Sequence, residues 1–296
     1  MKSDKKETHG NGNTINWFPG HMAKTKRKIK EILPLIDAVA EVVDARIPIS
    51  SRNPDLKEII GNKPHIVLLN KCDMADNAVT KEWIDYYKKS GIYAIALDCK
   101  SGKGINQFKS TVMNALSYKL EEYAKKGMVG KPLRVMVVGI PNVGKSSFIN
   151  KIAGKTRAKA ENRPGVTRGN QWFTIDKQLE LLDTPGVLWP KFEDQTVGER
   201  LAFTGAIKDN ILDTEYLAYK LIEILKNDYK ENLTARFGEL DFSLDAYELL
   251  CQIGKKRGMM IRGGETDTER AANMILEEYR NQKIGSISLE RVEDDA

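Results

Sequence analysis

The sequence predicts a mainly parallel α/β domain that is followed by an all-α domain. Short apolar runs alternate with helical stretches as far as about Pro190, which is typical of a parallel sheet covered by helices on both faces. One of these runs leads through a glycine-containing turn into a helix. After Pro190 the strand signal stops and leucines recur at helical spacing, which indicates the second domain.

The apolar runs themselves are the expected strands. They lie at residues 39–43, 66–69, 93–97 and 134–138, and at 171–175 and 179–182, which pair as a hairpin. A helical run is expected at 147–153. Residues 22–36 predict an amphipathic helix whose polar face is strongly basic. The basic residues of that helix are Lys24, Lys26, Arg27, Lys28 and Lys30.

The last third of the chain is expected to be helical. Leu217, Leu221 and Leu225 recur at i, i+4, as on the buried face of a helix. Ser243 and Asp267 stand where the N-caps of two further helices are expected. These patterns divide the chain into a polar tail at 1–14, an α/β domain at 15–190 that includes the basic helix, and a helical domain at 191–296. We expect the closing acidic residues, 290–296, to fray.

Composition excludes several classes of protein. Hydrophobic residues make up 41% of the chain and charged residues 30%, which indicates a globular protein. We expect a cytoplasmic protein, because no apolar run is long enough to span a membrane and the first 14 residues are polar. Cys72, Cys99 and Cys251 are too widely spaced for a CxxC metal site or a disulfide framework. The net charge of +6 fits either an anionic partner or ordinary solubility.

A P-loop motif follows the predicted strand at 134–138. The segment 139–146, GIPNVGKS, matches GxxxxGK[ST] between a strand and a helix. Its backbone amides would face the β-phosphate, Lys145 would act in catalysis by reaching the β and γ oxygens, and the Ser146 hydroxyl would ligate Mg²⁺. The residues expected to bind the nucleotide here are Gly139, Asn142, Val143, Gly144, Lys145, Ser146 and Ser147.

Two further segments are candidate switches. Asp183-Thr184-Pro185-Gly186 follows a strand as a DxxG motif, with Asp183 expected at Mg²⁺ and the Gly186 amide at the γ-phosphate. Thr167 lies between the P-loop and this motif, where it would supply a second hydroxyl to Mg²⁺ during catalysis. A turn and a surface threonine are the alternative interpretations.

Base recognition is predicted at Asn70-Lys71-Cys72-Asp73, an NKxD motif that closes a strand. The Asp73 carboxylate would accept hydrogen bonds from guanine N1–H and N2–H₂, which adenine does not offer, so the sequence favours GTP over ATP. Lys71 would lie along the base and Asn70 would brace the P-loop. Asp98 and Cys99 occupy the place of the second base-contacting loop, for which a plain loop is the alternative.

The order of these motifs is unusual. In a conventional GTPase the P-loop and switches precede NKxD, whereas here NKCD and DCKSG come before the P-loop. Because all these loops lie at the carboxyl ends of strands in one sheet, cutting the chain after the second switch and joining the old termini leaves the site intact. The sequence therefore predicts a circularly permuted P-loop GTPase domain. Its second switch leads directly into the helical domain, which γ-phosphate would reposition.

At this point the sequence resembles the family of circularly permuted ribosome-assembly GTPases, over about residues 15–289. The matching segments are NWFPGHM at 16–22, VDARIP at 43–48, NKCD at 70–73, GIPNVGKSS at 139–147, DTPG at 183–186, DTERAA at 267–272 and GSISL at 285–289. The resemblance implies a factor that acts late in assembly of the large ribosomal subunit. Such a factor binds the precursor particle and its ribosomal RNA with GTP and Mg²⁺, and leaves with GDP. We expect a monomer with no membrane partner.

Hydrolysis by the isolated protein is expected to be slow. A glutamine after DxxG orients water in Ras-type enzymes, but Val187 and Leu188 stand here. Asn142 resembles the asparagine that helps to bind K⁺ in related GTPases, and capping of the turn is its alternative role. The resemblance gives His21 a role in positioning water, whereas packing or RNA contact is the alternative.

Two basic patches are candidate RNA contacts. One is the helix at 24–30, beside Trp17 and Phe18, and the other comprises Lys255, Lys256, Arg257 and Arg262. Solvated lysines are the alternative for either patch. Two rival functions are a signalling GTPase with protein effectors, which the absence of a prenylatable C-terminal Cys disfavours, and an RNA-binding factor that uses GTP without turnover.

Overall fold

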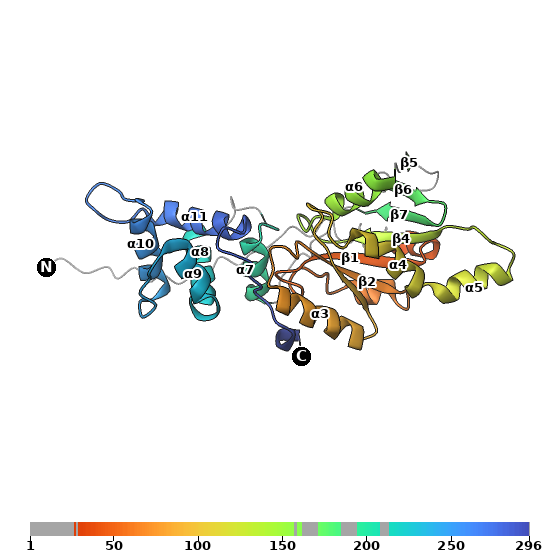
Figure 1. Ribbon diagram of the computed structural model, residues 1–296, viewed down its shortest axis with the longest axis horizontal. Helices are drawn as coiled ribbons and strands as arrows, with labels where there is room; N and C mark the ends of the chain where they lie inside the picture. Colours follow the sequence, from red (N-terminus) through yellow and green to blue (C-terminus); the bar gives the residue numbers. More distant parts are fainter. Residues whose placement is uncertain are drawn as a thin grey trace.

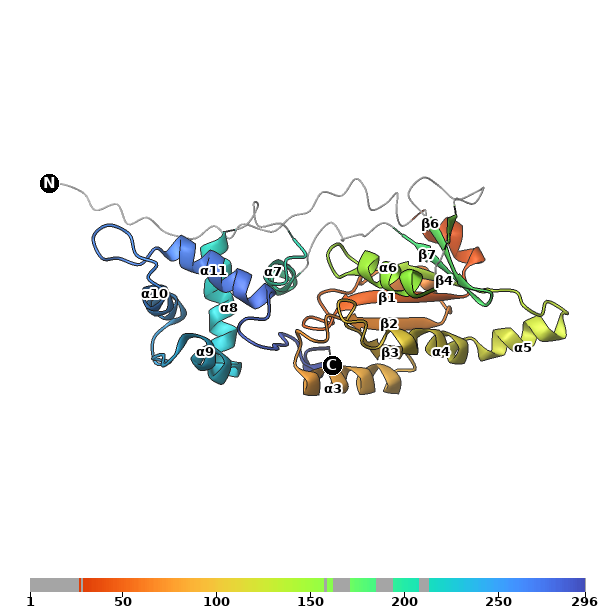
Figure 2. The same ribbon diagram turned by 45° about the horizontal axis from the view of Figure 1, so that its top comes forward.

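The computed structural model describes residues 27, 29–156, 159–161, 171–184, 194–207 and 213–295. A sheet with helices packed around it forms one part of the molecule, and helices alone form the other part (Figure 1). The two parts lie side by side along the longest axis, with α5 (Ser117–Lys125) at the end of the molecule that is remote from the helical part (Figures 1 and 2).

Within the described residues the sheet has seven strands in the order β3-β2-β1-β4-β7-β6-β5. Two neighbouring pairs are antiparallel, β5–β6 and β6–β7, because β6 runs opposite to the other strands. The strands are β1 (Ala38–Asp44), β2 (His65–Asn70), β3 (Tyr93–Ala96), β4 (Leu133–Val138), β5 (Lys159–Glu161), β6 (Gln171–Asp176) and β7 (Leu179–Asp183). The mainly parallel sheet is confirmed, and each predicted strand is found with ends displaced by at most one residue. Strand β5 is an addition that the apolar pattern did not indicate.

The order in which successive strands are added to the sheet reverses between β1 and β4. Strands β2 and β3 follow β1 outward on one side, whereas β7, β6 and β5 lie on the other side of β4. In open parallel sheets, ligands bind at the carboxyl ends of the strands beside such a switch point. The P-loop follows β4 at this point, so the fold places it where a nucleotide site is expected.

Alternating residues of the strands bury both faces of the sheet. On β1, for example, Ala40 and Val42 join the large core beneath α4 and α6, whereas Val43 packs toward Trp83 of α3. A T-shaped pair of Phe108 and Phe148, with ring centroids 5.0 Å apart, joins α4 to α6. The helices of this part are α2 (Leu56–Ile60), α3 (Asn77–Lys89), α4 (Ile105–Ala115), α5 and α6 (Lys145–Thr156).

The predicted basic helix is shorter than expected in the part that the structure describes. Its helical residues end at Ile32, and a 3-10 turn, η2 (Leu33–Leu35), follows because Pro34 cannot continue the helix. Ile29, Ile32 and Ile36 are buried against β1, β4 and β7. Of the five basic residues, only Arg27 and Lys30 lie within the described residues.

The helical part packs around α8, which contacts α9, α10 and α11. Leu217, Leu221 and Leu225 are buried on α8, as their spacing predicted. The helices are α7 (Gln195–Phe203), α8 (Thr214–Asp228), α9 (Lys230–Phe237), α10 (Ala246–Lys256) and α11 (Thr268–Arg280), with a final 3-10 turn, η4 (Val292–Asp295).

One of the two predicted N-caps is wrong. Asp267 caps α11 by accepting from the Arg270 amide, as expected. Ser243 caps nothing, because its hydroxyl donates to Asp241 in the turn before α10. Asp245, two residues later, accepts from the Glu248 amide and forms a capping box with the Glu248 side chain.

The closing segment is also unlike the prediction. Residues 290–295 were expected to fray, but Glu290 has no exposed surface and η4 packs against α3. The chain after α11 therefore returns to the α/β part, and the two parts share a contact beyond the single connection through α7.

Candidate functional site: a nucleotide pocket at the carboxyl ends of the strands

Five strand ends meet at one edge of the sheet, and four of them carry predicted site residues. Asp44 ends β1, Asn70 ends β2 and Asp183 ends β7, while Asp98 follows β3 and Gly139 follows β4. This convergence results from the parallel arrangement of β1, β2, β3, β4 and β7.

The P-loop has the backbone conformation of a tight turn. Asn142 and Gly144 have positive φ values of 63° and 97°, and α6 begins immediately afterwards at Lys145. A Cβ at Gly144 would collide with the Asn70 side-chain amide, so only glycine fits there. Ser146 and Ser147 are exposed at the start of α6, where the positive end of the helix dipole favours an anion.

Asn70 joins three of the predicted loops. Its Nδ2 donates to the Val143 carbonyl oxygen at 2.7 Å, and its Oδ1 accepts from the Cys99 amide at 3.3 Å. Because Asn70 is buried, each of these hydrogen bonds is expensive to lose. The backbone amide of Cys99, in the predicted second base-contacting loop, therefore braces Asn70.

Lys145 and Asp183 form an ion pair between the P-loop and the end of β7. Lys145 is buried to 8% exposure, so in the free protein Asp183 supplies a negative partner that a phosphate oxygen would replace. Thr184 donates to the Val137 carbonyl oxygen at 2.8 Å and holds this end of β7 against β4.

The oxygen donors at this edge suit magnesium. Ser146 offers an exposed hydroxyl and Asp183 a carboxylate, which are the hard oxygen ligands that Mg²⁺ takes beside nucleotide phosphates. The described residues contain no group of three or more His, Cys, Asp or Glu side chains that could hold a metal ion alone. Ser146 and Asp183 are therefore candidate ligands for a Mg²⁺ ion that is bound together with phosphate.

The NKCD segment forms a strained turn. Lys71 has a φ of 59°, and its ammonium lies 2.9 Å from Oδ2 of Asp44. Asp73 is half-buried, and its backbone carbonyl accepts hydrogen bonds from Gln282 and Ser286. Both residues expected to contact the base are thus positioned by neighbouring groups.

The second base loop is held by its own side chains. The Asp98 carboxylate accepts from the amides of Lys100 at 2.7 Å and Ser101 at 3.2 Å, so it stabilises the turn of its own loop. Burial, and then the nearby Asp98 charge, raise the pKa of Cys99 to about 12, which keeps the thiol neutral. A base-contacting loop and a plain loop were the two interpretations of this segment, and its role at the base stays a prediction.

Asn142 reaches across to the helical part. Its side-chain Nδ2 donates to the Gly205 carbonyl oxygen at 3.1 Å, in the turn that follows α7. The asparagine predicted to assist K⁺ binding therefore links the P-loop to the segment downstream of the second switch. His21, Thr167 and Gly186 lie outside the described residues, as do Trp17, Phe18, Val187 and Leu188.

A buried carboxylate at the end of β1 was missed by reasoning from sequence. Asp44 accepts from the Arg46 guanidinium at 2.9 and 2.8 Å, in addition to contacting Lys71. Burial alone would raise the pKa of Asp44, but Arg46 and Lys71 outweigh it and hold that pKa well below its usual range. The available signal was an Asp-x-Arg step directly after an apolar strand, where a buried carboxylate requires a cation.

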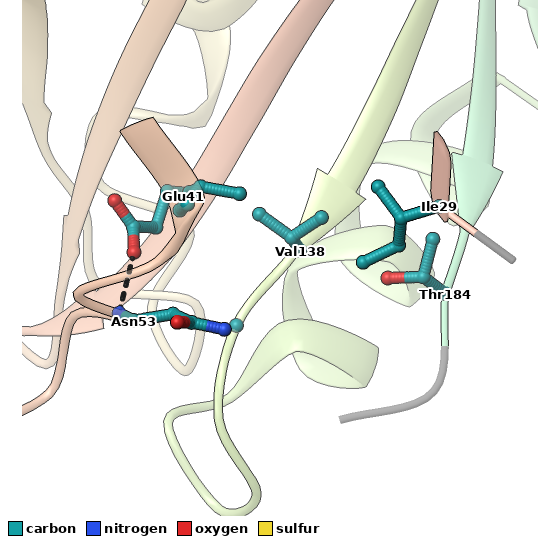
Figure 3. A pocket seen from close by; sticks show the side chains of 7 residues that line it. Ile29, Glu41, Asn53, Val138 and Thr184 are labelled. Carbon is teal, nitrogen blue, oxygen red and sulfur yellow. Dashed lines mark hydrogen bonds between the residues drawn. The ribbon is translucent and has the colours of Figure 1, made fainter. Parts of the chain in front are cut away.

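A small cavity lies behind the P-loop (Figure 3). Ile29, Val138 and Thr184 line it, together with Glu41, which accepts from the Asn53 amide at 3.0 Å. Its volume of about 20 Å³ suffices for a water-sized guest and not for a nucleotide.

The predicted C-terminal basic patch divides into two pairs. Lys256 donates to the carbonyl oxygens of Phe237 and Glu239, and Arg257 lies over the Phe237 ring at 5.1 Å, so both tie α10 to α9. Lys255 and Arg262 are exposed. The loop after α10 also exposes Met260 and Ile261, with 41% and 48% of their surface accessible.

Comparisons with known proteins agree with this site. A family model described as "50S ribosome-binding GTPase" matches residues 134–234. Ribosome biogenesis GTPase A of Priestia megaterium is 52% identical over 94% of this chain and 96% of its own length. The protein of the same name from Thermotoga maritima is 32% identical over 95% of each chain.

Two solved structures also match most of this chain. A structure titled as GDP-bound TM YlqF matches 90% of this chain and 100% of its own, with a TM-score of 0.65 and 29% identity. The GNP-bound YlqF of T. maritima matches 90% of this chain and 98% of its own, with a TM-score of 0.62 and 30% identity. No helix in the described ranges of the present chain has the length and apolar character needed to cross a membrane.

Proposed function

Because the chain belongs to the ribosome biogenesis GTPase A family, we propose that it is an assembly factor for late maturation of the large ribosomal subunit. The protein is a GTPase, which converts GTP and water to GDP and phosphate. In the proposed cycle it binds the precursor particle with GTP and leaves after hydrolysis. It acts as a monomer in the cytoplasm.

One observation carries the proposal. The P-loop, the NKCD turn and Asp183 lie at one sheet edge, and Asn142 in that P-loop donates to Gly205 at 3.1 Å in the helical part. A change at the phosphates can therefore be transmitted to a part of the molecule that carries exposed basic residues. Such a coupling suits a factor that binds RNA in one nucleotide state and releases it in the other.

The chain's own residues would perform the following steps. When GTP enters, Lys145 exchanges Asp183 for the β and γ oxygens, which releases the Asp183 carboxylate toward the metal side of the pocket. Ser146, Asp183 and the predicted Thr167 would hold Mg²⁺, which neutralises charge on the β and γ oxygens when it is bound. Asp73 and Lys71 would hold the guanine, and the Gly186 amide the γ-phosphate.

Turnover by the protein alone is proposed to be slow, and the particle to stimulate it. Val187 and Leu188 cannot orient water, so another group must do so. His21 is the proposed residue, with K⁺ held near Asn142 supplying positive charge. Single-turnover hydrolysis by His21→Ala, with and without particles and in KCl against NaCl, tests both. Equal rates in all conditions at intact binding would remove both groups from the mechanism.

RNA contact is proposed through the exposed cations of the helical part. Lys255 and Arg262 are exposed, whereas Lys256 and Arg257 tie α10 to α9. Lys255→Ala with Arg262→Ala should weaken particle binding and reduce its salt dependence, since each lost phosphate contact releases about one counterion fewer.

Sedimentation with large-subunit precursors tests the proposed cycle. The protein should co-sediment with the particle in a non-hydrolysable GTP analogue and remain in the supernatant with GDP. Lys145→Ala, which removes the phosphate contact, is the matched control and should stay in the supernatant in both states. Equal binding in both nucleotide states would refute the proposed release step.

A further inference from the structure

The chain between α11 and η4 returns to the predicted guanine site. We call residues 282–290 the strap and residues 70–76 the base turn. Gly285 of the strap has a φ of 118°, and a Cβ there would collide with the Asn232 side-chain amide. Asn232 in turn donates to the Ile284 carbonyl oxygen at 3.1 Å, which fixes the start of the strap to α9.

The strap contacts the base turn through four hydrogen bonds. The Asp73 carbonyl oxygen accepts from Gln282 Nε2 at 2.5 Å and from Ser286 Oγ at 2.9 Å. One residue further along, the Ile287 amide donates to the Met74 carbonyl oxygen at 2.9 Å. Ser288 Oγ accepts from the amide of Asp76, the N-cap of α3, at 3.1 Å.

The far end of the strap is anchored more firmly. The fully buried Glu290 accepts from the amides of Ile49 at 2.5 Å and Ser50 at 3.0 Å, and from Arg200 of α7 at 3.2 Å. The Trp83 indole donates to the Glu290 carbonyl oxygen at 3.3 Å. The strap is thus fixed between α7 and the α/β part and forms a rigid support for the base turn.

Lys71, the second residue expected to contact the base, is also connected to the helical part. Lys71 is held by Asp44, which also holds Arg46, and the Arg46 guanidinium lies 5.2 Å above the ring of Tyr279 on α11. The Arg46 carbonyl oxygen accepts from the Leu289 amide of the strap at 2.8 Å. Both Lys71 and Asp73 are therefore supported from the helical part.

We propose that Gln282 and Ser286 are positioning residues for guanine recognition. By holding the Asp73 carbonyl from outside the pocket, they fix the direction in which the Asp73 carboxylate meets N1–H and N2–H₂ of the base. The inference rests on the proposed assignment of NKCD as the guanine site. It assigns a nucleotide-specificity role to the helical part, which the P-loop and switches alone do not require.

The test compares GDP with IDP, which lacks the 2-amino group of guanine. The double variant Gln282→Met with Ser286→Ala removes both donors to Asp73 and leaves the Ile287 backbone hydrogen bond in place. The control is Asn281→Met with Ser243→Ala, which removes one amide and one hydroxyl from exposed residues of the same helical part. Dissociation constants of both nucleotides are measured for wild type, variant and control.

We expect the variant to bind GDP about tenfold more weakly and IDP less affected, so that the ratio of the IDP to the GDP dissociation constant falls at least about threefold. The control should keep the wild-type ratio. Ser286→Ala alone, at an exposed position, should lower the ratio by a smaller factor, and it replaces the double variant if that variant does not fold.

Two results separate the possible failures. If wild type prefers GDP and the variant keeps the same ratio, even with both affinities reduced, the strap has only a structural role and the inference is wrong. If wild type binds GDP and IDP equally, the assignment of NKCD as the guanine site fails and the inference fails with it.

Discussion

Two buried carboxylates support the nucleotide edge in opposite ways. Asp44 is neutralised by cations from its own neighbourhood, Arg46 two residues away and Lys71 on the adjacent strand end. Glu290 accepts mainly neutral donors from a distant part of the chain, Ile49 and Ser50, and has Arg200 as a cation at 3.2 Å. Asp44 thus belongs to a local charge cluster that holds Lys71. Glu290 instead makes long-range hydrogen bonds that attach the strap to the α/β part.

The pKa values of Asp44 and Glu290 are shifted in opposite directions. Arg46 and Lys71 overcome burial and hold the pKa of Asp44 well below its usual range. For Glu290, burial dominates over the hydrogen bonds from Ser50 and the charge of Arg200, and its pKa is raised. A carboxylate that is surrounded by cations is therefore distinguished from one that is paired largely with amides.

The largest expected effect is that of Asp44→Asn. It leaves the buried Arg46 without its counter-charge and releases Lys71, so the free energy of unfolding should fall by about 3–5 kcal/mol. Urea denaturation measures this loss. Asp228→Asn, at an exposed position on α8, is the control and should change stability by less than about 0.5 kcal/mol. An equally small loss for Asp44→Asn would contradict the view of a cation-neutralised cluster.

Glu290→Gln should cost less. The amide oxygen can still accept from Ile49 or Ser50, but the new NH₂ group faces the Arg200 guanidinium and the donors around it. A loss of about 1–3 kcal/mol is expected in the same denaturation experiment. A loss as large as that of Asp44→Asn would mean that Arg200, rather than the amides, is the principal partner.

Replacing Arg46 or Arg200 by lysine tests how strongly Asp44 and Glu290 each depend on a guanidinium partner. Arg46→Lys breaks a two-point contact with Asp44 and removes the guanidinium from the Tyr279 ring, so about 2 kcal/mol should be lost. Arg200→Lys should cost less than about 1 kcal/mol, because Glu290 keeps its amide donors. Calorimetric unfolding of both variants makes the comparison, which fails if the order is reversed.

The smallest expected effect is the pH dependence, in which the two residues should have opposite signs. The folded pKa of Asp44 is lowered, so its stabilisation is complete above about pH 4 and is lost as the pH falls further. The folded pKa of Glu290 is raised, so its contribution decreases as the pH rises above about 4.5. The difference in unfolding free energy between wild type and each Asn or Gln variant, followed from pH 3 to 7, measures both; slopes of the same sign would refute the assignment.

The sheet and the P-loop were predictable because their signals are local. Residues 39–43 are apolar apart from Glu41 and lie between Asp37 and Asp44. Gly144 belongs to a glycine pattern that a single turn requires. Ser243 was a wrong prediction because Asp245, two residues later, offers the same chemistry with a better-placed Glu248.

The supports of the site were not predictable for a different reason. Asp44 has the appearance of an ordinary residue at a strand end, and Glu290 lies in an acidic stretch that resembles a frayed terminus. Only the fold shows that Glu290 meets Ser50, which lies 240 residues earlier in the chain. No local pattern encodes such a contact. The predicted roles of His21 and Thr167 stay predictions, because these residues lie outside the described ranges.

The 240-residue separation between Glu290 and Ser50 has a consequence for synthesis of the protein. The base turn leaves the translating ribosome early, the P-loop later and the strap last, at about 5–20 residues per second. The base turn therefore waits on the order of 10–50 s for the support that Gln282 and Ser286 supply. A nascent chain that has not yet reached the strap lacks these hydrogen bonds, so on the proposed role of Gln282 and Ser286 it should bind guanine nucleotides more weakly than a chain that includes the strap.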